Sequence, residues 1–205
     1  DSGDGSGDQP AGAANAGAAN DDLVTSNDTI TLEGGTNTVV AGVGTDTVTV
    51  GAGTNVILGD EGKLDVNADG TTTVQTINGA SGDIDTIEIG EGQNVAFGGF
   101  GKDTITVRST PGAGGGVTPR AHVVGDNGTL TLDTLGRLVS ISSSDEAVGD
   151  ADTITLQSGE NTVIGGRGGD IIKAVDGVNT VLSDAGSAQF TGGLLTSISS
   201  FVPTD

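Results

Sequence analysis

The 205-residue chain contains no cysteine, methionine, tryptophan or tyrosine, and its aromatic residues are four phenylalanines. The absence of cysteine excludes disulfides and thiolate chemistry, although it does not by itself assign a compartment. His122 is the only histidine and there is no GxSxG segment, so zinc and nucleophilic chemistry have no set of partner residues. We therefore predict that the protein is not an enzyme and that His122 is a surface residue. Because methionine is missing, we expect the first residue to be a processed end or the start of a fragment.

Basic residues are also scarce: seven lysines and arginines stand against 28 acidic residues, which gives a formal net charge of −21. So few cations cannot form a track for phosphates, which argues against DNA or RNA as a partner. No run approaches the roughly 18 apolar residues of a membrane span, and no signal peptide is recognisable. Hydrophobic residues make up 33% of the chain, so we expect a thin core whose burial alone is a weak source of stability.

What the chain does contain is a nine-residue repeat. It runs from residue 23 to residue 58 as LVTSNDTIT, LEGGTNTVV, AGVGTDTVT and VGAGTNVIL, and it restarts over residues 80–106 and 147–182. A fixed nine-residue period with glycine at the corners is typical of a parallel β-solenoid. We therefore predict an all-β protein built as a parallel β-roll.

Regular interruptions divide the chain into a Gly/Ala/Asp-rich arm and three super-repeats of one continuous solenoid. The predicted limits are 1–22 for the arm and 23–79, 80–146 and 147–205 for the super-repeats. Each super-repeat has four nonapeptides, a GDxG-like corner and a non-periodic segment with β-branched runs around turn residues. Such segments are predicted to be β-hairpins that interrupt the roll. They span residues 64–77, 129–143 and 189–200.

GGFGKDTIT at 98–106 and GGRGGDIIK at 165–173 resemble the RTX, or hemolysin-type, calcium-binding repeat, as AGVGTDTVT at 41–49 does more loosely. The resemblance covers a little over half of the chain, and the nonapeptides with asparagine at position six depart from the pattern. It implies a calcium-dependent β-roll in an extracellular bacterial setting, exported unfolded by the type I route through a C-terminal signal. Residues 194–205 could be such a signal, but they repeat 137–144, which favours a third hairpin.

Two nonapeptides make one coil of such a roll, so odd units stack on one side and even units on the other. Position six is aspartate in the odd units: Asp28, Asp46, Asp85, Asp103, Asp152 and Asp170. In the even units position six is asparagine, except in one stretched unit, where it is Ala121. The asparagines are Asn37, Asn55, Asn94, Asn161 and Asn179. Calcium takes roughly six to eight oxygens, including carboxylates and backbone carbonyls. We therefore predict several calcium ions along the aspartate side and an asparagine ladder along the other.

Five further acids are candidate metal ligands. The corner residues Asp60, Asp126 and Asp184 recur once per super-repeat, and either cap the turn into the hairpin or bind a further cation. Asp83 and Asp150 lie two residues before members of the aspartate row. Residues 65–70 resemble the start of an EF-hand loop, but that loop needs an acid at its twelfth position, which here is threonine. A hairpin turn is therefore favoured there.

The strands show a second asymmetry. Side chains at position eight and at position one of the next unit alternate inward and form the predicted core. On the aspartate side the outward positions are mostly threonine. On the asparagine side position nine is apolar in every coil, and we expect the hairpins or another subunit to cover this stripe. Its members are Val40, Leu58, Phe97, Val124, Ile164 and Leu182.

The leading hypothesis for function is a calcium-stabilised structural or adhesive module of a bacterial cell surface. It would be a building block of a filament or surface layer, or a segment of a giant surface protein, with copies of itself head to tail as the partner. Solenoid ends without capping units tend to stack onwards, and this chain begins and ends at super-repeat boundaries. The alternatives are the calcium-binding export module of a secreted hydrolase and an ice- or glycan-binding solenoid that uses the threonine face.

Overall fold

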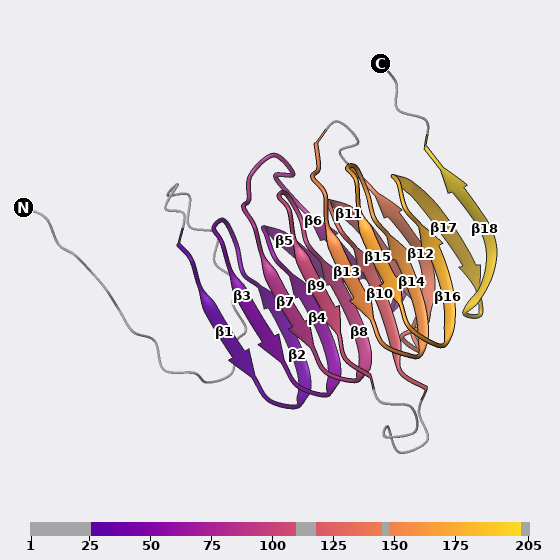
Figure 1. Cartoon of the computed structure of the whole chain (residues 1–205). Helices are drawn as coiled ribbons and strands as arrows, with labels where there is room; N and C mark the ends of the chain where they lie inside the picture. The colour runs from indigo at the N-terminus through magenta and orange to yellow at the C-terminus, as the bar shows by residue number, and fades with distance from the viewer. Residues whose placement is uncertain (1–25, 110–117, 145–147, 202–205) are drawn as a thin grey trace, which may run out of the picture.

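The computed structural model describes residues 26–109, 118–144 and 148–201, and the predicted arm at 1–22 lies outside these ranges. The described residues form 18 strands in three six-stranded sheets, stacked as an elongated roll (Figure 1). Within these ranges no helix is long and apolar enough to cross a membrane. The all-β prediction is confirmed.

The first two sheets are parallel and form the walls of the roll. Sheet A consists of β1 (Thr29–Leu32), β3 (Thr47–Val50), β7 (Thr86–Ile89), β9 (Thr104–Val107), β13 (Thr153–Leu156) and β15 (Ile171–Ala174). Sheet B consists of β2 (Gly35–Val40), β4 (Gly53–Leu58), β8 (Gly92–Phe97), β10 (Arg120–Val124), β14 (Glu160–Ile164) and β16 (Val178–Leu182). One strand of each sheet makes one coil, so two nonapeptides form a coil as predicted.

The core of the roll lies between sheets A and B. Equivalent residues of successive coils pair in register, so Val48 lies beside Ile87 and Ile87 beside Ile105. All three are fully buried. The outward-facing threonines of the same strands are mostly exposed or half-buried. The inward and outward positions are therefore those that the nine-residue period predicts.

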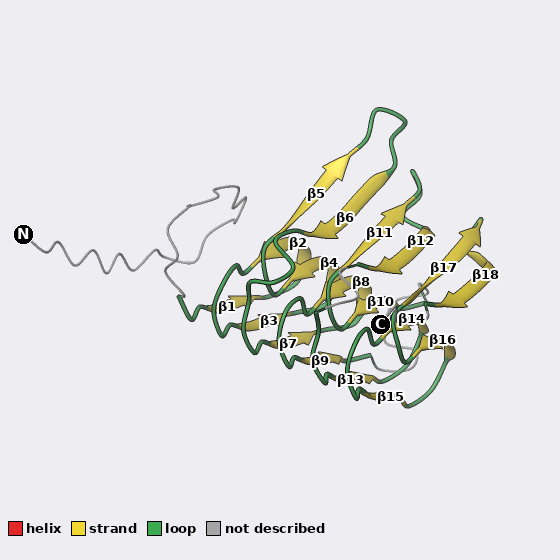
Figure 2. Ribbon diagram, turned by 90° about the horizontal axis from the view of Figure 1, so that it is seen from above, coloured by secondary structure: helices red, strands yellow, loops and turns green. Residues whose placement is uncertain are grey.

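Sheet C is antiparallel and consists of the three hairpins. Its strands are β5 (Gly62–Val66), β6 (Thr72–Thr76), β11 (Gly128–Leu132), β12 (Leu138–Ser143), β17 (Gly186–Thr191) and β18 (Leu194–Ser200). Figure 2 shows the three rows of strands side by side, with the hairpins beyond sheet B. Because residues 194–200 form a strand of this sheet, the third-hairpin interpretation is confirmed.

A second core lies between sheets B and C. Phe97 and Leu58 of sheet B are fully buried against Leu130 and Ile141 of the hairpins. The apolar stripe at position nine is thus covered by the chain's own hairpins along most of the roll.

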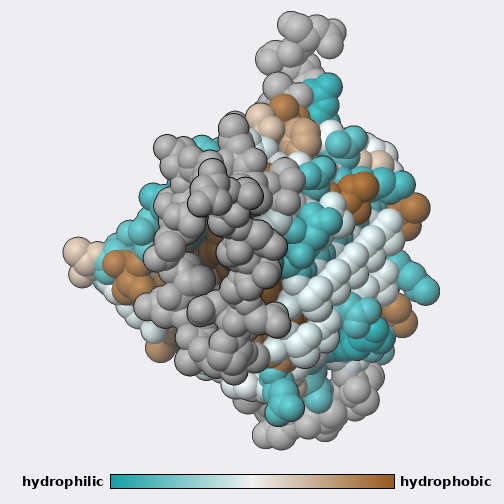
Figure 3. All heavy atoms as spheres, turned by 90° about the vertical axis from the view of Figure 1, so that its left-hand side faces the viewer, coloured by the Kyte–Doolittle hydropathy of each residue, from teal (hydrophilic) through white to brown (hydrophobic). Residues whose placement is uncertain are grey.

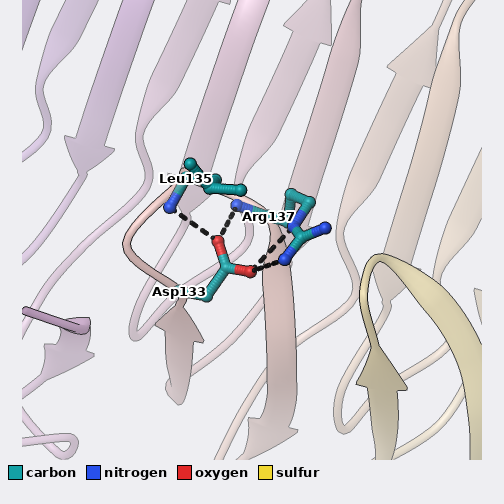
Figure 4. A network of polar contacts seen from close by, with 3 residues as sticks. All are labelled: Asp133, Leu135 and Arg137. Carbon is teal, nitrogen blue, oxygen red and sulfur yellow. Dashed lines mark hydrogen bonds and ion pairs between the residues drawn. The ribbon is translucent and has the colours of Figure 1, made fainter.

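Polar contacts hold the hairpin turns. The carboxylate of Asp133 accepts the main-chain N–H groups of Leu135 and Arg137 at 2.9 Å and the Arg137 guanidinium at 2.7 to 2.8 Å (Figure 4). The side-chain hydrogen bond from Arg137 lowers the pKa of Asp133. In the first hairpin, Asp69 accepts the N–H and the hydroxyl of Thr71 at 3.0 and 2.7 Å. Residues 65–70 therefore form the end of β5 and the turn of a hairpin, and not an EF-hand loop.

Candidate metal centre

The six position-six aspartates form one line at the corner where each sheet B strand leads into a sheet A strand. We call this line the aspartate row. Five successive main-chain N–H groups each donate to the Oδ1 of the row member one coil further on, at 2.6 to 2.9 Å. The sequence predicted which residues share this edge, and the hydrogen bonds show that Oδ1 ties successive coils together.

The second carboxylate oxygen of the row has a different environment. Among the described residues, the Oδ2 atoms of five row members are buried without a hydrogen-bond partner: Asp46, Asp85, Asp103, Asp152 and Asp170. Leaving a buried charged oxygen unpaired is costly, because the group loses its hydration and gains nothing in return. Each of these oxygens would therefore be stabilised by a bound proton or a bound cation.

The electrostatics of the row lead to the same conclusion. Burial raises the pKa of Asp103 to about 9, that of Asp152 to about 8 and that of Asp85 to about 7, from an ordinary value of 3.8. Neighbouring carboxylates add to each shift. Burial also raises the pKa of Asp46 and of Asp170. Without a counter-charge the row favours protons, and a divalent cation would replace them.

Glycines lie directly against the Oδ2 atoms of four row members: Asp85, Asp103, Asp152 and Asp170. A Cβ placed on Gly98 would lie 2.4 Å from the Oδ2 of Asp103 and 2.1 Å from the carbonyl oxygen of Gly125 in the next coil. The same pair of oxygens borders three equivalent glycines: Gly59, Gly125 and Gly165. A carboxylate oxygen and a carbonyl oxygen from two coils thus converge beside a residue without a side chain. Sequence reasoning listed glycine as a corner residue but missed this role.

The donor set is one that suits calcium. No group of three acidic or histidine side chains converges anywhere in the described ranges. Each step of the row instead offers one carboxylate per coil together with backbone carbonyls. Hard carboxylate and carbonyl oxygens in a flexible arrangement are what calcium accepts, whereas structural zinc needs nitrogen or sulfur ligands. The residues that would hold calcium are the row aspartates from Asp46 onward and the carbonyls of Gly98, Gly125, Gly165 and Ser183.

Three of the predicted ligands lie apart from these oxygens. Asp28, the first member of the row, is exposed at the end of the roll. Asp83 and Asp150 are also exposed, and their main-chain carbonyls lie close to glycines of the next coil, Gly101 and Gly168. Asp83 and Asp150 are at position four of their nonapeptides, and within the described chain they do not join the row.

The sequence left two roles open for the corner acids, a cap on the turn into the hairpin or a ligand of a further cation. Asp126 accepts the N–H of Asp150 at 3.2 Å, and the Oδ1 of Asp60 is buried without a hydrogen-bond partner among the described residues. The carboxylate of Asp60 accepts the N–H of Phe100 at 2.5 Å, and that of Asp126 accepts the N–H of Arg167. Both acids are buried, and burial raises the pKa of Asp60 to about 8 and that of Asp126 to about 7. Each therefore ties its own corner to the third residue of the next turn, which we call the corner contact. Asp184, the third corner acid, is exposed.

The opposite edge of the roll is an amide ladder. The Nδ2 of Asn37 donates to the Oδ1 of Asn55 at 2.8 Å, and Asn55 donates to Asn94 at 2.9 Å. A second run joins Asn161 to Asn179 at 2.8 Å. The predicted ladder is confirmed in two runs, separated by the coil that carries alanine at this position.

The single histidine is buried, so its expected surface position is wrong. His122 is 7% exposed, on the face of sheet B that the second hairpin covers. Burial lowers its pKa to about 4, and its Nδ1 has no hydrogen-bond partner among the described residues. It lines a cavity of about 210 Å³ with Arg120, Gln93 and residues of the hairpin turn. The sequence carried no signal for this burial, because the cover comes from a segment outside the repeat.

A comparison with known families agrees with this chemistry. The model of the RTX calcium-binding nonapeptide repeat matches residues 15–48, 31–63, 79–107 and 147–187, which together make up more than half of the chain. The chain therefore belongs to the RTX calcium-binding repeat family, and calcium is the ion that its aspartate row fits. Searches of curated proteins and of solved structures returned no significant match.

Proposed function

We propose that the chain is a non-enzymatic, calcium-stabilised structural module of a bacterial extracellular or cell-surface protein. Copies of it would stack end to end into a filament or a layer. The observation that carries the proposal is the line of five buried Oδ2 atoms that have no hydrogen-bond partner in the described part of the chain. RTX repeats are typical of secreted bacterial proteins, which supports the extracellular setting and is compatible with type I export.

Calcium would act as a condition for rigidity. In its absence the buried carboxylates oppose the stacking of coils, and a net charge of −21 adds further repulsion. Bound calcium would link the carboxylate of each coil to the carbonyl oxygens of its neighbour. The module would then be stiff where calcium is abundant and poorly folded where calcium is scarce.

The shape of the roll supports the stacking role. Among the described residues, the outermost strands of the three sheets are β1, β2 and β5 at one end and β15, β16 and β18 at the other. Open strand edges pair readily with another chain.

Two other functions share some of these features. A calcium-binding export module of a secreted hydrolase would have the same repeats, and the complete reading frame would show a catalytic domain beside them. An ice- or glycan-binding face would need an unbroken threonine surface on sheet A. There, Glu88 lies between Thr49 and Thr106 and forms an ion pair with Arg108, which interrupts the row. We therefore favour the structural role.

The experiment is a calcium titration of the purified chain after chelation, followed by circular dichroism and sedimentation velocity. We expect β signal and particle mass to rise together with calcium, and equal concentrations of magnesium to have little effect. A β signal that is the same in chelator and in calcium would contradict the calcium-stabilised role. A fold gained with calcium but a mass that stays monomeric at all concentrations would contradict stacking.

A further inference from the structure

The asparagines of the amide ladder satisfy one another. The Oδ1 of Asn55 accepts the Nδ2 of Asn37 at 2.8 Å, and its own Nδ2 donates to the Oδ1 of Asn94 at 2.9 Å and to the carbonyl oxygen of Gly51 at 3.1 Å. The Nδ2 of Asn94 donates to the carbonyl oxygen of Gly90 at 2.9 Å. A side-chain amide carries both donors and an acceptor, so neighbouring coils are joined here without an ion.

The carboxylates of the aspartate row cannot join one another in this way, although they are equally buried. Asn55 and Asp85 are both fully buried. An ionised carboxylate accepts hydrogen bonds and donates none, so two row members cannot bond through their side chains. The Oδ1 atoms of Asp85 and Asp103 accept main-chain N–H groups, and their Oδ2 atoms have no hydrogen-bond partner among the described residues. The two edges therefore differ in their donors and not in their burial.

The amide edge also disfavours a cation. The N–H groups of Asn55 and Asn94 point at the carbonyl oxygens of Gly51 and Gly90, so a cation beside these oxygens would face the positive ends of N–H dipoles. The asparagines contribute no charge, and the affinity of a calcium site depends on the number of its charged ligands. The residue type at position six therefore confines calcium to the row.

The two edges act on layers that are covered to different degrees. Sheet B is covered on both faces: Ile57 and Leu58 of β4 are fully buried, one in the core against sheet A and the other in the core against sheet C. Within the described ranges sheet A is covered on one face, so Val48 of β3 is buried while Thr47 and Thr49 are exposed. Pale rows of intermediate hydropathy, the colour that threonine takes on this scale, lie open on the surface in Figure 3. With four-residue strands and one covered face, sheet A is the layer that depends most on the row.

We propose that Asn55 and Asn94 exclude calcium from their edge, so that sheet A depends on the ion while sheets B and C hold together without it. This inference rests on the calcium-stabilised role proposed above and states which part of the chain calcium controls. The ladder joins successive coils of sheet B, and Phe97, Leu130 and Ile141 join sheet B to the hairpins. Without calcium the coils separate at the aspartate row, where the carboxylates repel one another, and keep their register at the amide ladder.

Hydrogen exchange of the wild-type chain in chelator and in millimolar calcium tests this division. We expect the removal of calcium to speed exchange roughly tenfold or more in sheet A and at the N–H groups of the row, and to leave sheets B and C nearly as protected as they are in calcium. Equal or greater loss of protection in sheets B and C would overturn the inference and leave the calcium-stabilised role in place. Unchanged exchange in all three sheets would overturn both.

The asparagine itself is tested by Asn94→Asp, with Gln189→Glu as the matched control. Asn94→Asp keeps the shape of the side chain but replaces the N–H donor to Gly90 by a carboxylate oxygen, at a position that is 2% exposed. In chelator, exchange in sheet B should become roughly tenfold faster or more. In calcium the protection should return, with about one further ion bound. Gln189→Glu makes the same change at an exposed position of sheet C and should behave as the wild type under both conditions.

Exchange and calorimetric titration together give the outcome for Asn94→Asp. Wild-type protection of sheet B in chelator, or a loss of protection that calcium does not restore with a further ion, would overturn the exclusion of calcium by the amide. Should the variant fail to fold under both conditions, the exchange of the wild-type chain decides.

Discussion

The main-chain N–H of Asp103 donates to the Oδ1 of Asp152 at 2.8 Å across one coil, while the Oδ2 of Asp152 is buried without a hydrogen-bond partner in the described part of the chain. One carboxylate therefore has two separate tasks. Its Oδ1 fixes the distance between coils, and its Oδ2 is left for a cation. The coil spacing and the metal site depend on the same side chain, so folding and calcium binding stabilise each other.

The first prediction concerns pH in the absence of calcium. The pKa values of Asp85, Asp152 and Asp103 are raised to about 7, 8 and 9 in the fold from an ordinary 3.8. Between the ordinary pKa of 3.8 and the raised values, the folded chain binds more protons than the unfolded chain. The free energy of unfolding therefore falls as the pH rises through this window. The metal-free protein should therefore be most stable at about pH 4 and lose stability progressively up to about pH 9. Urea unfolding in chelator across this range measures the trend.

The control for this prediction is salt. Repulsion between exposed carboxylates also weakens on acidification, but added salt screens it, whereas the buried row is screened much less. The pH dependence should therefore persist in high salt. Saturating calcium should weaken or reverse it, because the ion replaces the protons. A metal-free protein whose stability rises with pH would contradict the electrostatics of the row.

The second prediction is that Asp103→Asn acts in opposite directions with and without calcium. The substitution removes the charge whose burial raises the pKa of Asp103 most strongly within the row. In chelator the variant should be more stable than the wild type by roughly 1–3 kcal/mol, the scale of an unpaired buried group. In calcium it should be less stable, because a carboxylate ligand is lost. Chemical unfolding under both conditions gives the two signs.

Asp65→Asn is the matched control for this pair of measurements. Asp65 is exposed on the first hairpin and forms an ion pair with Lys63, so its loss should change little under either condition. A stabilisation of both variants in chelator would point to total charge, and not to the row, as the cause.

The sequence was sufficient to predict the members of the aspartate row. Asp83 and Asp85 are two residues apart, and only the nine-residue period distinguishes them: position six, occupied by Asp85, is buried, and Asp83 is exposed. The period also predicted the amide ladder and the apolar stripe that the hairpins cover. These features repeat from coil to coil, so a one-dimensional pattern contains them.

The corner contacts could not be predicted in the same way. Asp60 and Phe100 are 40 residues apart, with a hairpin and a full coil between them, and the contact uses a main-chain N–H that no residue type announces. The available signal was the spacing itself, since Asp126 and Arg167 are 41 apart and hold equivalent places in their turns. The burial of His122 was equally out of reach, because its cover is not part of the repeat.

The third prediction tests the space beside the row. Gly98→Ala should place a methyl group against the Oδ2 of Asp103 and the carbonyl of Gly125, and should destabilise the chain by roughly 1–3 kcal/mol through overpacking. It should also lower the calcium content by about one ion, because the methyl group would displace the carboxylate and carbonyl oxygens that would bind it. Calorimetric titration gives the number of ions, and thermal unfolding gives the stability.

Gly169→Ala is the control for this substitution. A Cβ there would meet no atom within 4 Å, and neither Gly98 nor Gly169 has a left-handed φ, so the two variants differ in space and not in backbone strain. The control should bind as much calcium as the wild type. If Gly98→Ala keeps the full calcium content, the glycine positions do not border the metal.

The last prediction separates the hairpin sheet from the metal sites. Ile141 of β12 is fully buried between sheets B and C, so Ile141→Ala should cost about 2–5 kcal/mol, from lost burial and the cavity left behind. Leu135, in the turn of the same hairpin, is 73% exposed, and Leu135→Ala should cost little. Hydrogen exchange in calcium should show faster exchange across sheet C in Ile141→Ala, while the calcium content stays that of the wild type, because the row lies at the corner between sheets A and B. Loss of calcium from Ile141→Ala would instead mean that the hairpins and the metal sites fold as a single unit.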